Sequence, residues 1–171
     1  MKKLYAGVGP RNTDPRILDV MTQLAGELEE MGWKLRSGHG KGADQAFEAG
    51  TKNKEIWLPE AGFNGAFMQF PWYHVTGNVG ESSIARMHHP GYMKCNEYVQ
   101  RLFNRNVNIL VGKNCDNPVS CVIYQQPPDN DIMSFGGTNH TLRMAATMGI
   151  PTFNIQVDAE RDALSEFILC E

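Results

Sequence analysis

Residues 4–50 read LYAGVG, PRNTDP, RILDVMTQLAGELEEMG, WKLRS, GHGKG and ADQAFEAG in succession, and this stretch decides the fold. The short apolar run at 4–9 ends in glycine, as expected of a buried strand. Apolar residues then recur at steps of three and four from 17 to 31, which predicts a helix that begins near Asp14-Pro15 and ends at Gly32. Residues 33–37 and 43–50 repeat the strand-to-helix order.

The rest of the chain continues this alternation. We expect strands at 55–58, 119–124 and 150–155, and helices at 82–87, 96–107, 136–148 and 158–171. The stretch from about 60 to 85 combines glycine, aromatic residues and asparagine without a clean period, so we expect an irregular insertion there. The predicted fold class is α/β, with a doubly wound, mostly parallel, Rossmann-like sheet in a single domain spanning 1–171.

Composition limits the possible functions. The chain has 171 residues, 42% hydrophobic and 20% charged, as expected of one globular domain. Its formal net charge of -3 provides no global cationic field, which disfavours nucleic acid as a partner. No apolar run approaches the roughly 20 residues that cross a bilayer, so we expect a cytoplasmic protein with no membrane partner. The four cysteines show neither metal nor disulfide spacing and are expected to be reduced thiols.

Three glycine-containing turns directly follow predicted strands. They lie at 7–11, 37–42 and 135–138, and the carboxyl ends of parallel strands meet at one edge of a sheet. Helices that begin at this edge present free N–H groups and a partial positive charge to an anion. Glycine lets the backbone approach a phosphate closely and adopt positive φ angles. The three turns together predict a phosphate site, although each one alone is equally typical of a strand end.

Familiar nucleotide and metal motifs do not match. Residues 38–42, GHGKG, lack the GK[ST] ending of a Walker A loop, and no turn fits GxGxxG with an acidic residue about twenty positions later. Classical NAD binding and ATP hydrolysis are therefore disfavoured, and the sequence predicts no cofactor. His88 and His89 are adjacent, with no carboxylate or thiolate at ligand spacing, so no metal site is predicted.

Residues 5–11, 37–47, 104–107 and 136–151 together resemble the SLOG superfamily. That group includes DprA-like proteins, the LOG phosphoribohydrolases related to "lysine decarboxylase-like" proteins, and small stand-alone members often found in phages. The resemblance covers most of the chain, except for about 60–85 and the tail. It implies a Rossmann-like fold, a nucleotide-type ligand and a homo-oligomer, but it does not select one activity.

The resemblance also assigns positions within the site. Arg105-Asn106 stands where the LOG enzymes have an Arg-Lys pair, and Gly136-Gly137 matches their paired glycines. Arg143 stands at the position of the LOG glutamate, which takes part in cleaving the N-glycosidic bond of a nucleoside monophosphate. A guanidinium can neither stabilise an oxocarbenium-like sugar as a carboxylate does nor activate water. We therefore expect Arg143 to clamp a second phosphate or a carboxylate instead.

Two carboxylates could still support hydrolysis. Asp44 and Glu48 are four residues apart and so share one face of the helix after the second glycine turn. Alternatively, Asp44 caps or orients its loop and Glu48 is solvated. His140 follows the paired glycines and either meets the ligand or caps the helix. The aromatic residues between 63 and 73 either stack on a base or cover the core or an oligomer interface.

Three functions stay open on the sequence alone. The first is binding of a nucleotide or nucleotide-derived small molecule that the protein senses or sequesters, for example in viral counter-defence. The second is a nucleotide N-glycosidase that acts on nucleoside monophosphates or ADP-ribose-like compounds with Asp44 or Glu48 as catalytic groups. The third, DprA-like handling of single-stranded DNA, is weaker because the chain is acidic. The predicted ligand-binding residues are Gly7, Gly9, Arg11, Ser37, Gly38, Gly40, Lys41, Gly42, Asp44, Arg105, Gly136, Gly137, Thr138, Asn139, His140 and Arg143.

Overall fold

The computed structural model describes residues 2–78, 80–127, 129, 131, 133 and 136–170. In this part of the chain, six strands form one sheet in the order β4-β3-β2-β1-β5-β6, and every neighbouring pair is parallel. The predicted doubly wound α/β class is confirmed. The strands are β1 (Leu4–Val8), β2 (Lys34–Ser37), β3 (Lys54–Leu58), β4 (Tyr73–Val75), β5 (Cys121–Tyr124) and β6 (Thr152–Asn154).

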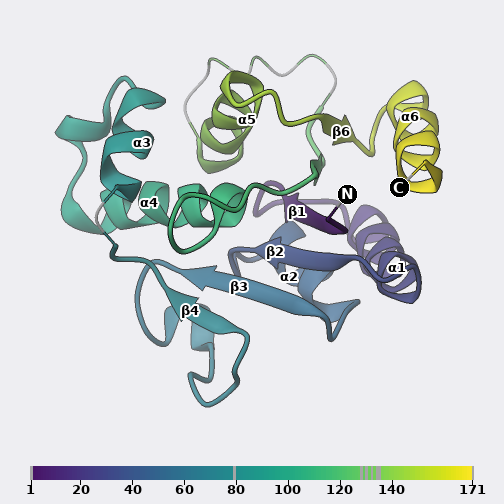
Figure 1. Cartoon of the computed structure of the whole chain (residues 1–171), viewed down its shortest axis with the longest axis horizontal. Coiled ribbons are helices and arrows are strands. Elements are labelled where there is room, and N and C mark those ends of the chain that lie inside the picture. Colours follow the sequence, from purple (N-terminus) through teal and green to yellow (C-terminus); the bar gives the residue numbers. More distant parts are fainter. Residues whose placement is uncertain are drawn as a thin grey trace.

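Helices cover both faces of the sheet (Figure 1). One face carries α1 (Pro15–Glu30), α2 (Ala43–Ala49) and α6 (Asp158–Leu169). The opposite face carries α3 (Glu81–Met87), α4 (Glu97–Val111) and α5 (Gly137–Thr147). Two short 3₁₀ turns, Phe63–Gly65 and Tyr92–Lys94, lie in the connections. Each face therefore has its own apolar core.

Strand β1 shows why both faces are apolar. Tyr5 points into the α1-α2 core, where its ring meets Trp33 at 6.5 Å and Phe47 at 6.4 Å between centroids. Leu4 and Ala6 point into the core under α4 and α5. A central strand buried on both faces needs apolar residues at every position, and the run at 4–8 meets that need.

Helix α1 has the ends that the sequence predicts. The Asp14 side chain accepts the Arg16 N–H at 2.9 Å and Pro15 occupies the first helical position. At the other end Gly32 has a φ of 84°, a left-handed conformation that glycine adopts without steric cost. The chain then turns directly into β2 beside β1. The N-cap and C-terminal glycine predictions are confirmed.

The segment from 60 to 85 contains a strand that the sequence did not reveal. Strand β4 adds to the edge of the sheet, with Tyr73 opposite Ile56 of β3. Its connection to α3 is held by the buried Glu81 carboxylate, which accepts Asn108 Nδ2 at 2.7 Å and Thr76 Oγ1 at 2.6 Å. A three-residue edge strand is too short to show an alternating pattern, which is why no period was visible.

No helix in the described ranges is long and apolar enough to span a membrane.

Phe47 and Phe67 offer a matched test of the core. Phe47 has no exposed surface and contacts Tyr5 of β1, whereas Phe67 is 65% exposed. We expect Phe47→Ala to lower the free energy of unfolding by about 3–5 kcal/mol, because it removes a buried ring and leaves a cavity. Phe67→Ala should change it by less than about 0.5 kcal/mol. Urea unfolding followed by circular dichroism measures both, and equal losses would contradict the described packing.

Candidate functional site

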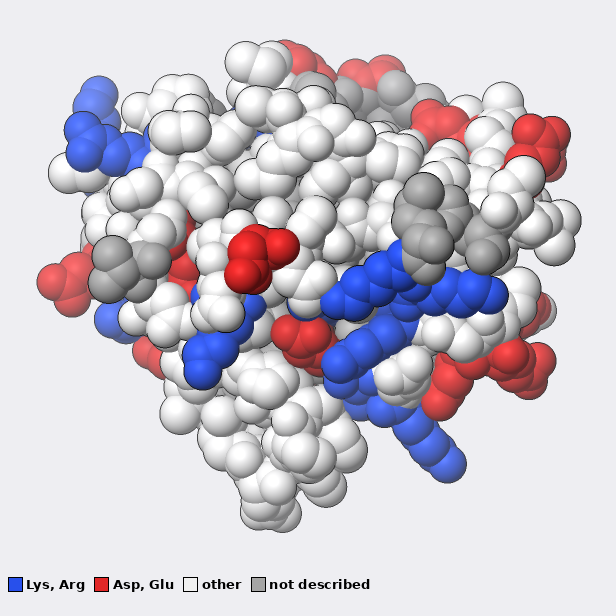
Figure 2. All heavy atoms as spheres, viewed as in Figure 1, with Lys and Arg blue, Asp and Glu red and all other residues white. Residues whose placement is uncertain are grey.

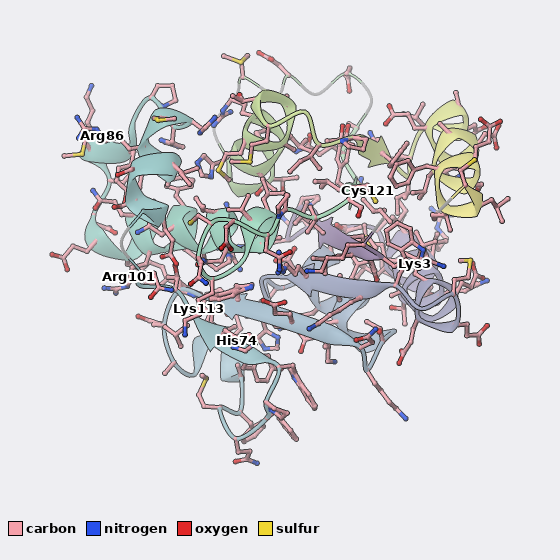
Figure 3. The ribbon with its side chains drawn as sticks, viewed as in Figure 1. Lys3, His74, Arg86, Arg101, Lys113 and Cys121 are labelled. Atoms are coloured by element: carbon pink, nitrogen blue, oxygen red, sulfur yellow. The ribbon has the colours of Figure 1, made fainter. Side chains whose placement is uncertain are left out.

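A cavity of about 460 Å³ lies at the carboxyl edge of the sheet, where the strand order reverses between β1 and β5. Chain connections leave these two strands in opposite directions, so a crevice forms that nucleotide ligands of open α/β folds commonly use. Figure 3 labels Lys3 and Cys121, which lie at the amino ends of β1 and β5. The cavity lies beyond the carboxyl ends of these two strands. The size suits a small organic ligand.

Four segments supply the wall. The turn after β1 contributes Gly9 and Arg11, and the turn after β2 contributes Gly40 and Lys41 before Asp44 of α2. The other two segments are the start of α5 and one face of α4. Their lining residues are Gly136, Gly137, Thr138, Asn139 and Thr141 of the α5 segment, and Val99, Leu102, Phe103, Arg105, Asn106 and Ile109 of α4. Phe63 and Gln126 also contribute.

At several positions in the first two turns, neighbouring protein atoms occupy the space that a side chain would need, so only glycine fits without a shift. A Cβ at Gly7 would lie 2.7 Å from the Phe47 ring, and a Cβ at Gly9 would lie 2.6 Å from the Ala43 Cβ. These positions let α2 pack closely against β1. Gly42 has a φ of 82° and would meet the Arg11 carbonyl oxygen at 2.4 Å. Packing alone therefore accounts for these three glycines.

The glycines at the start of α5 are different. Among the described residues, a Cβ at Gly136 would meet no atom within 4 Å, and a Cβ at Gly137 would meet only Asn106 Nδ2, at 3.8 Å. Both residues are exposed, and Gly136 has a φ of 143°. Among the described residues of the three turns, Gly136 and Gly137 are the glycines that leave open space beside the first N–H groups of a helix, which have no acceptor within the helix itself. Phe135, which begins the third predicted turn, lies outside the described residues.

The guanidinium group of Arg105 is the cation at the base of the cavity. Its side chain is buried, its Nη1 donates to the Gly38 carbonyl oxygen and its Nε donates to Asn106 Oδ1 at 3.0 Å. The Cζ lies 5.8 Å from the centre of the Phe63 ring. Burial lowers the pKa of Arg105, an effect that the carboxylate of Asp44 opposes. A Cβ at Gly38 would lie 1.8 Å from Nη1, so glycine at 38 makes room for the guanidinium.

Asp44 supplies the opposing charge. Its Oδ2 lies 3.9 Å from Arg105 Nη1 and accepts the Gly40 N–H at 3.2 Å. Burial raises the pKa of Asp44, whereas Arg105 and the N–H groups of Gly40 and Gly9 act in the opposite direction. The pair places one buried cation and one buried carboxyl in the same wall.

Hydrogen bonds connect the second and third turns across the base of the cavity. The Gly38 carbonyl oxygen accepts from Arg105, Arg105 donates to Asn106, and Asn106 Nδ2 donates to the Gly137 carbonyl oxygen at 3.2 Å. Two successive residues of α4 thus set the distance between the β2-α2 turn and the start of α5. Any ligand between these turns would lie directly above this chain of contacts.

Several predicted site residues do not line the cavity. Ser37 Oγ donates to the Gly7 carbonyl oxygen at 2.7 Å inside the sheet. Glu48 accepts Tyr73 OH at 2.7 Å and pairs with His39 Nδ1 at 2.6 Å, and it does not line the cavity that Asp44 lines. Of the predicted residues, the cavity wall lacks Gly7, Ser37, Gly38, Gly42, Glu48, His140 and Arg143.

His140 and Arg143 lie on another side of α5. The His140 ring is fully buried, its Nε2 lies 3.2 Å from the Ala85 carbonyl oxygen, and its centroid is 4.8 Å from that of Phe103. Burial lowers its pKa to about 3, so the ring is neutral at ordinary pH. Arg143 Nε donates to the His88 carbonyl oxygen at 3.0 Å. Residues three apart lie on the same face of a helix, so Arg143 shares the face of His140. That face is directed toward α3 and not toward the cavity.

The sequence did not reveal that one face of α4 lines the cavity. Phe63, which also lines it, belongs to the aromatic group expected either to stack on a base or to cover the core or an oligomer interface. Val99, Leu102 and Phe103 form an apolar surface that looked like ordinary core spacing. A usable signal was present nearby, since Arg105 and Asn106 interrupt an otherwise apolar helix face and both are buried. Phe70 and Trp72 of the same aromatic group stack on each other at 4.6 Å, apart from the cavity wall.

Comparison with known proteins supports the fold. No family profile and no curated protein matches the chain. One solved structure that matches is DNA processing protein A from Helicobacter pylori, which was determined to study its single-stranded DNA binding mode. It shares 17% sequence identity and a TM-score of 0.54, over 98% of this chain and 73% of that one. This likeness shows a DprA-like, Rossmann-like fold.

The comparison corrects one expectation. Nucleic acid was disfavoured as a partner on the grounds of the net charge of -3. That inference is wrong, because a protein with the same fold binds single-stranded DNA. Net charge sums over the whole surface and does not describe the charge of one site.

Arg105 offers a test of the buried pair. Without its guanidinium, Asp44 would be a buried carboxyl with no cation, so we expect Arg105→Leu to lower the free energy of unfolding by about 3 kcal/mol at neutral pH. Arg16→Leu, which removes an exposed cation, should lower it far less.

The loss of stability in Arg105→Leu should also depend on pH, and the pKa of Asp44 determines the direction of this dependence. Burial already raises the pKa of Asp44 in the folded protein, and loss of Arg105 raises it further. The folded state then holds a proton that the unfolded chain releases, so stability falls as pH rises through the folded pKa. The difference between Arg105→Leu and wild type in urea unfolding should therefore shrink when the pH is lowered toward about 4. A difference that does not vary with pH would contradict this account.

Proposed function

We propose that the cavity binds the phosphate of a nucleotide-type small molecule and retains the ligand without cleaving it. The observation that carries this proposal is the open start of α5, where Gly136 and Gly137 leave side-chain space empty beside the cavity. Free N–H groups and the positive end of the helix dipole stabilise a phosphate at such a position. The buried charges of Arg105 and Asp44 in the same wall provide further polar contacts.

Cations at the rim favour an anionic ligand. Arg11 and Lys41 are exposed and follow β1 and β2 on the side of the cavity opposite α5. Either side chain can reach a phosphate in solvent without the desolvation cost that a buried cation incurs. The cavity lining that the structure describes contains three cations and one carboxyl, so its local charge is positive although the chain is acidic.

The arrangement of carboxylates supports binding over hydrolysis. Asp44 is the one acidic side chain in the described cavity wall, and Glu48 is held by His39 and Tyr73 outside it. Enzymes that hydrolyse glycosides through two carboxyl groups place both beside the scissile bond. Arg143, at the position of the LOG glutamate, is bonded to the His88 carbonyl oxygen. The N-glycosidase alternative would have to rely on Asp44 alone.

Titration with nucleoside monophosphates separates binding from cleavage. We expect calorimetry to detect a one-to-one complex with at least one 5′-monophosphate, and chromatography of the same mixture to recover it intact. ADP-ribose belongs in the panel because it presents the same phosphate and sugar groups. Release of free base, abolished by Asp44→Asn, would favour the N-glycosidase instead. Absence of binding across the panel would overturn the proposal.

Gly137→Val tests the phosphate position directly. The two added methyl groups would extend into the space beside the α5 N–H groups, whereas the Cβ meets no atom closer than 3.8 Å. We expect ligand affinity to fall by at least about tenfold, with a loss of stability of no more than about 1 kcal/mol. Ala146→Val is the control, since it places the same side chain on an exposed position of the same helix. Equal affinities in the two variants would exclude this turn from the site.

Single-stranded DNA is a second candidate ligand, favoured by the fold shared with a single-stranded DNA-binding protein. Lysine and arginine side chains also gather in a band over β1 and β2 on the face that Figure 2 shows. Lys3, which is labelled in Figure 3, lies beside the amino end of β1. Local cationic surfaces of this kind bind phosphate backbones even on acidic proteins.

Mobility shifts with a labelled oligothymidylate test this candidate. If DNA uses the cavity, a nucleoside monophosphate should displace it and Gly137→Val should weaken it. If DNA binds the band near Lys3, Lys3→Gln should weaken binding while the monophosphate has no effect. In both cases the affinity should fall steeply as salt increases. Absence of a shift at low salt would remove DNA as a ligand.

A further inference from the structure

Asp44 limits what a ligand can place beside it. The residue is 7% exposed and lines the cavity, and its carboxyl accepts the Gly40 N–H at 3.2 Å. Arg105 Nη1 lies 3.9 Å away, which is an ion pair but too long for a hydrogen bond. A carboxylate offers about four acceptor positions. The backbone donors therefore leave part of this capacity to groups inside the cavity.

The Arg105 cation 3.9 Å away favours the charged form of Asp44, and a charged carboxylate accepts hydrogen bonds and cannot donate them. A ligand must therefore bring O–H or N–H donors to Asp44. A phosphate oxygen at the same place would meet a like charge in a poorly solvated wall, where Coulomb repulsion is weakly screened. The phosphate accordingly belongs at the start of α5, where Gly136 and Gly137 leave open space.

The apolar part of the wall suits a base. Phe63 and three residues of α4, Val99, Leu102 and Phe103, contribute flat or aliphatic surface to the same cavity. Aromatic and aliphatic side chains bury the faces of a planar ring favourably. In a nucleotide the sugar connects the phosphate to the base. With the phosphate on α5 and the base on the apolar wall, the sugar hydroxyls are the donors that remain for Asp44.

We propose that Asp44 accepts hydrogen bonds from the ribose hydroxyls of the ligand, so that the site selects ribonucleotides over 2′-deoxyribonucleotides. This inference rests on the proposed function, since it names the class of nucleotide that the cavity takes. The role of Asp44 is then specificity for the sugar, which accounts for a buried carboxylate in a cavity wall whose other described residues are cationic, neutral polar or apolar.

Pairs of ligands test the inference on the unmodified protein. Each 5′-ribonucleoside monophosphate is compared by calorimetry with its 2′-deoxy counterpart, which has the same base and phosphate. A hydrogen bond to a charged group is worth enough to produce a preference of about tenfold or more for the ribose form. Equal affinity within each pair would overturn the inference while leaving the proposed function intact.

Asp44→Asn then tests whether this carboxylate produces the preference. The substitution keeps the shape of the side chain but removes the charge and one acceptor, so the ribose preference should fall by about tenfold, mainly through weaker binding of the ribonucleotide. Asp19→Asn removes the same charge from an exposed position of α1 and should keep the wild-type preference. Thermal unfolding checks that both variants fold. A preference that survives in a folded Asp44→Asn protein would assign it to another group.

The two proposals fail in different ways. If no monophosphate of either sugar binds, both are overturned. If both sugars bind equally and Gly137→Val abolishes binding, the phosphate position stands and the assignment of Asp44 is wrong. If the 2′-deoxy form binds more tightly, the assignment is also wrong, and a deoxynucleotide or single-stranded DNA becomes the better candidate ligand.

Discussion

Arg105 buries a guanidinium group beneath the backbone of Gly38, beside the carboxyl of Asp44. A buried cation is costly unless hydrogen-bond acceptors and an opposing charge surround it, and the contacts from Gly38, Asn106 and Asp44 meet that need. Because these partners come from the β2-α2 turn, from α2 and from α4, the single side chain holds three segments at fixed positions. The cavity opens above that point, and its shape depends on the pair.

The same contact explains why a side chain at 38 would displace the Arg105 guanidinium, and why the other glycines are not equivalent to Gly38. Gly7 and Gly9 allow α2 to approach β1, and Gly38 allows a side chain to approach the backbone. Gly136 and Gly137 have open space instead. Glycine-rich turns at a sheet edge thus arise from two physical causes, close packing within the protein and access for a ligand. Only the second cause points to function.

The orientation of α5 makes this site different from that expected of the LOG phosphoribohydrolases, which the sequence pattern resembles. Its start faces the cavity, whereas His140 and Arg143 turn toward α3 and Phe103. The described cavity wall has one carboxylate, held beside a buried cation, and this favours our proposal of nucleotide recognition over cleavage of a glycosidic bond. The chain shares its fold with a protein that binds single-stranded DNA, so a free nucleotide and a DNA strand are the two ligands that we propose.

Local patterns were sufficient for much of the structure. The apolar run at 4–8, the Asp14 cap and Gly32 are each read from a few neighbouring residues, and the alternation of strands and helices leads to a parallel sheet whose carboxyl ends meet. Strand β4 was not predicted, because three residues at a sheet edge are too few to show an alternating pattern.

The sequence by itself therefore determined the α/β class and the edge at which glycine-rich turns gather. Tertiary structure alone decided which glycines face open space, that Asp44 enters the cavity while Glu48 is held by Tyr73, and that Arg143 points away. Spacing along a helix places two residues on one face, but it does not state what that face meets. Contacts between segments distant in the chain, such as Arg105 with Gly38, are set by packing of the whole molecule.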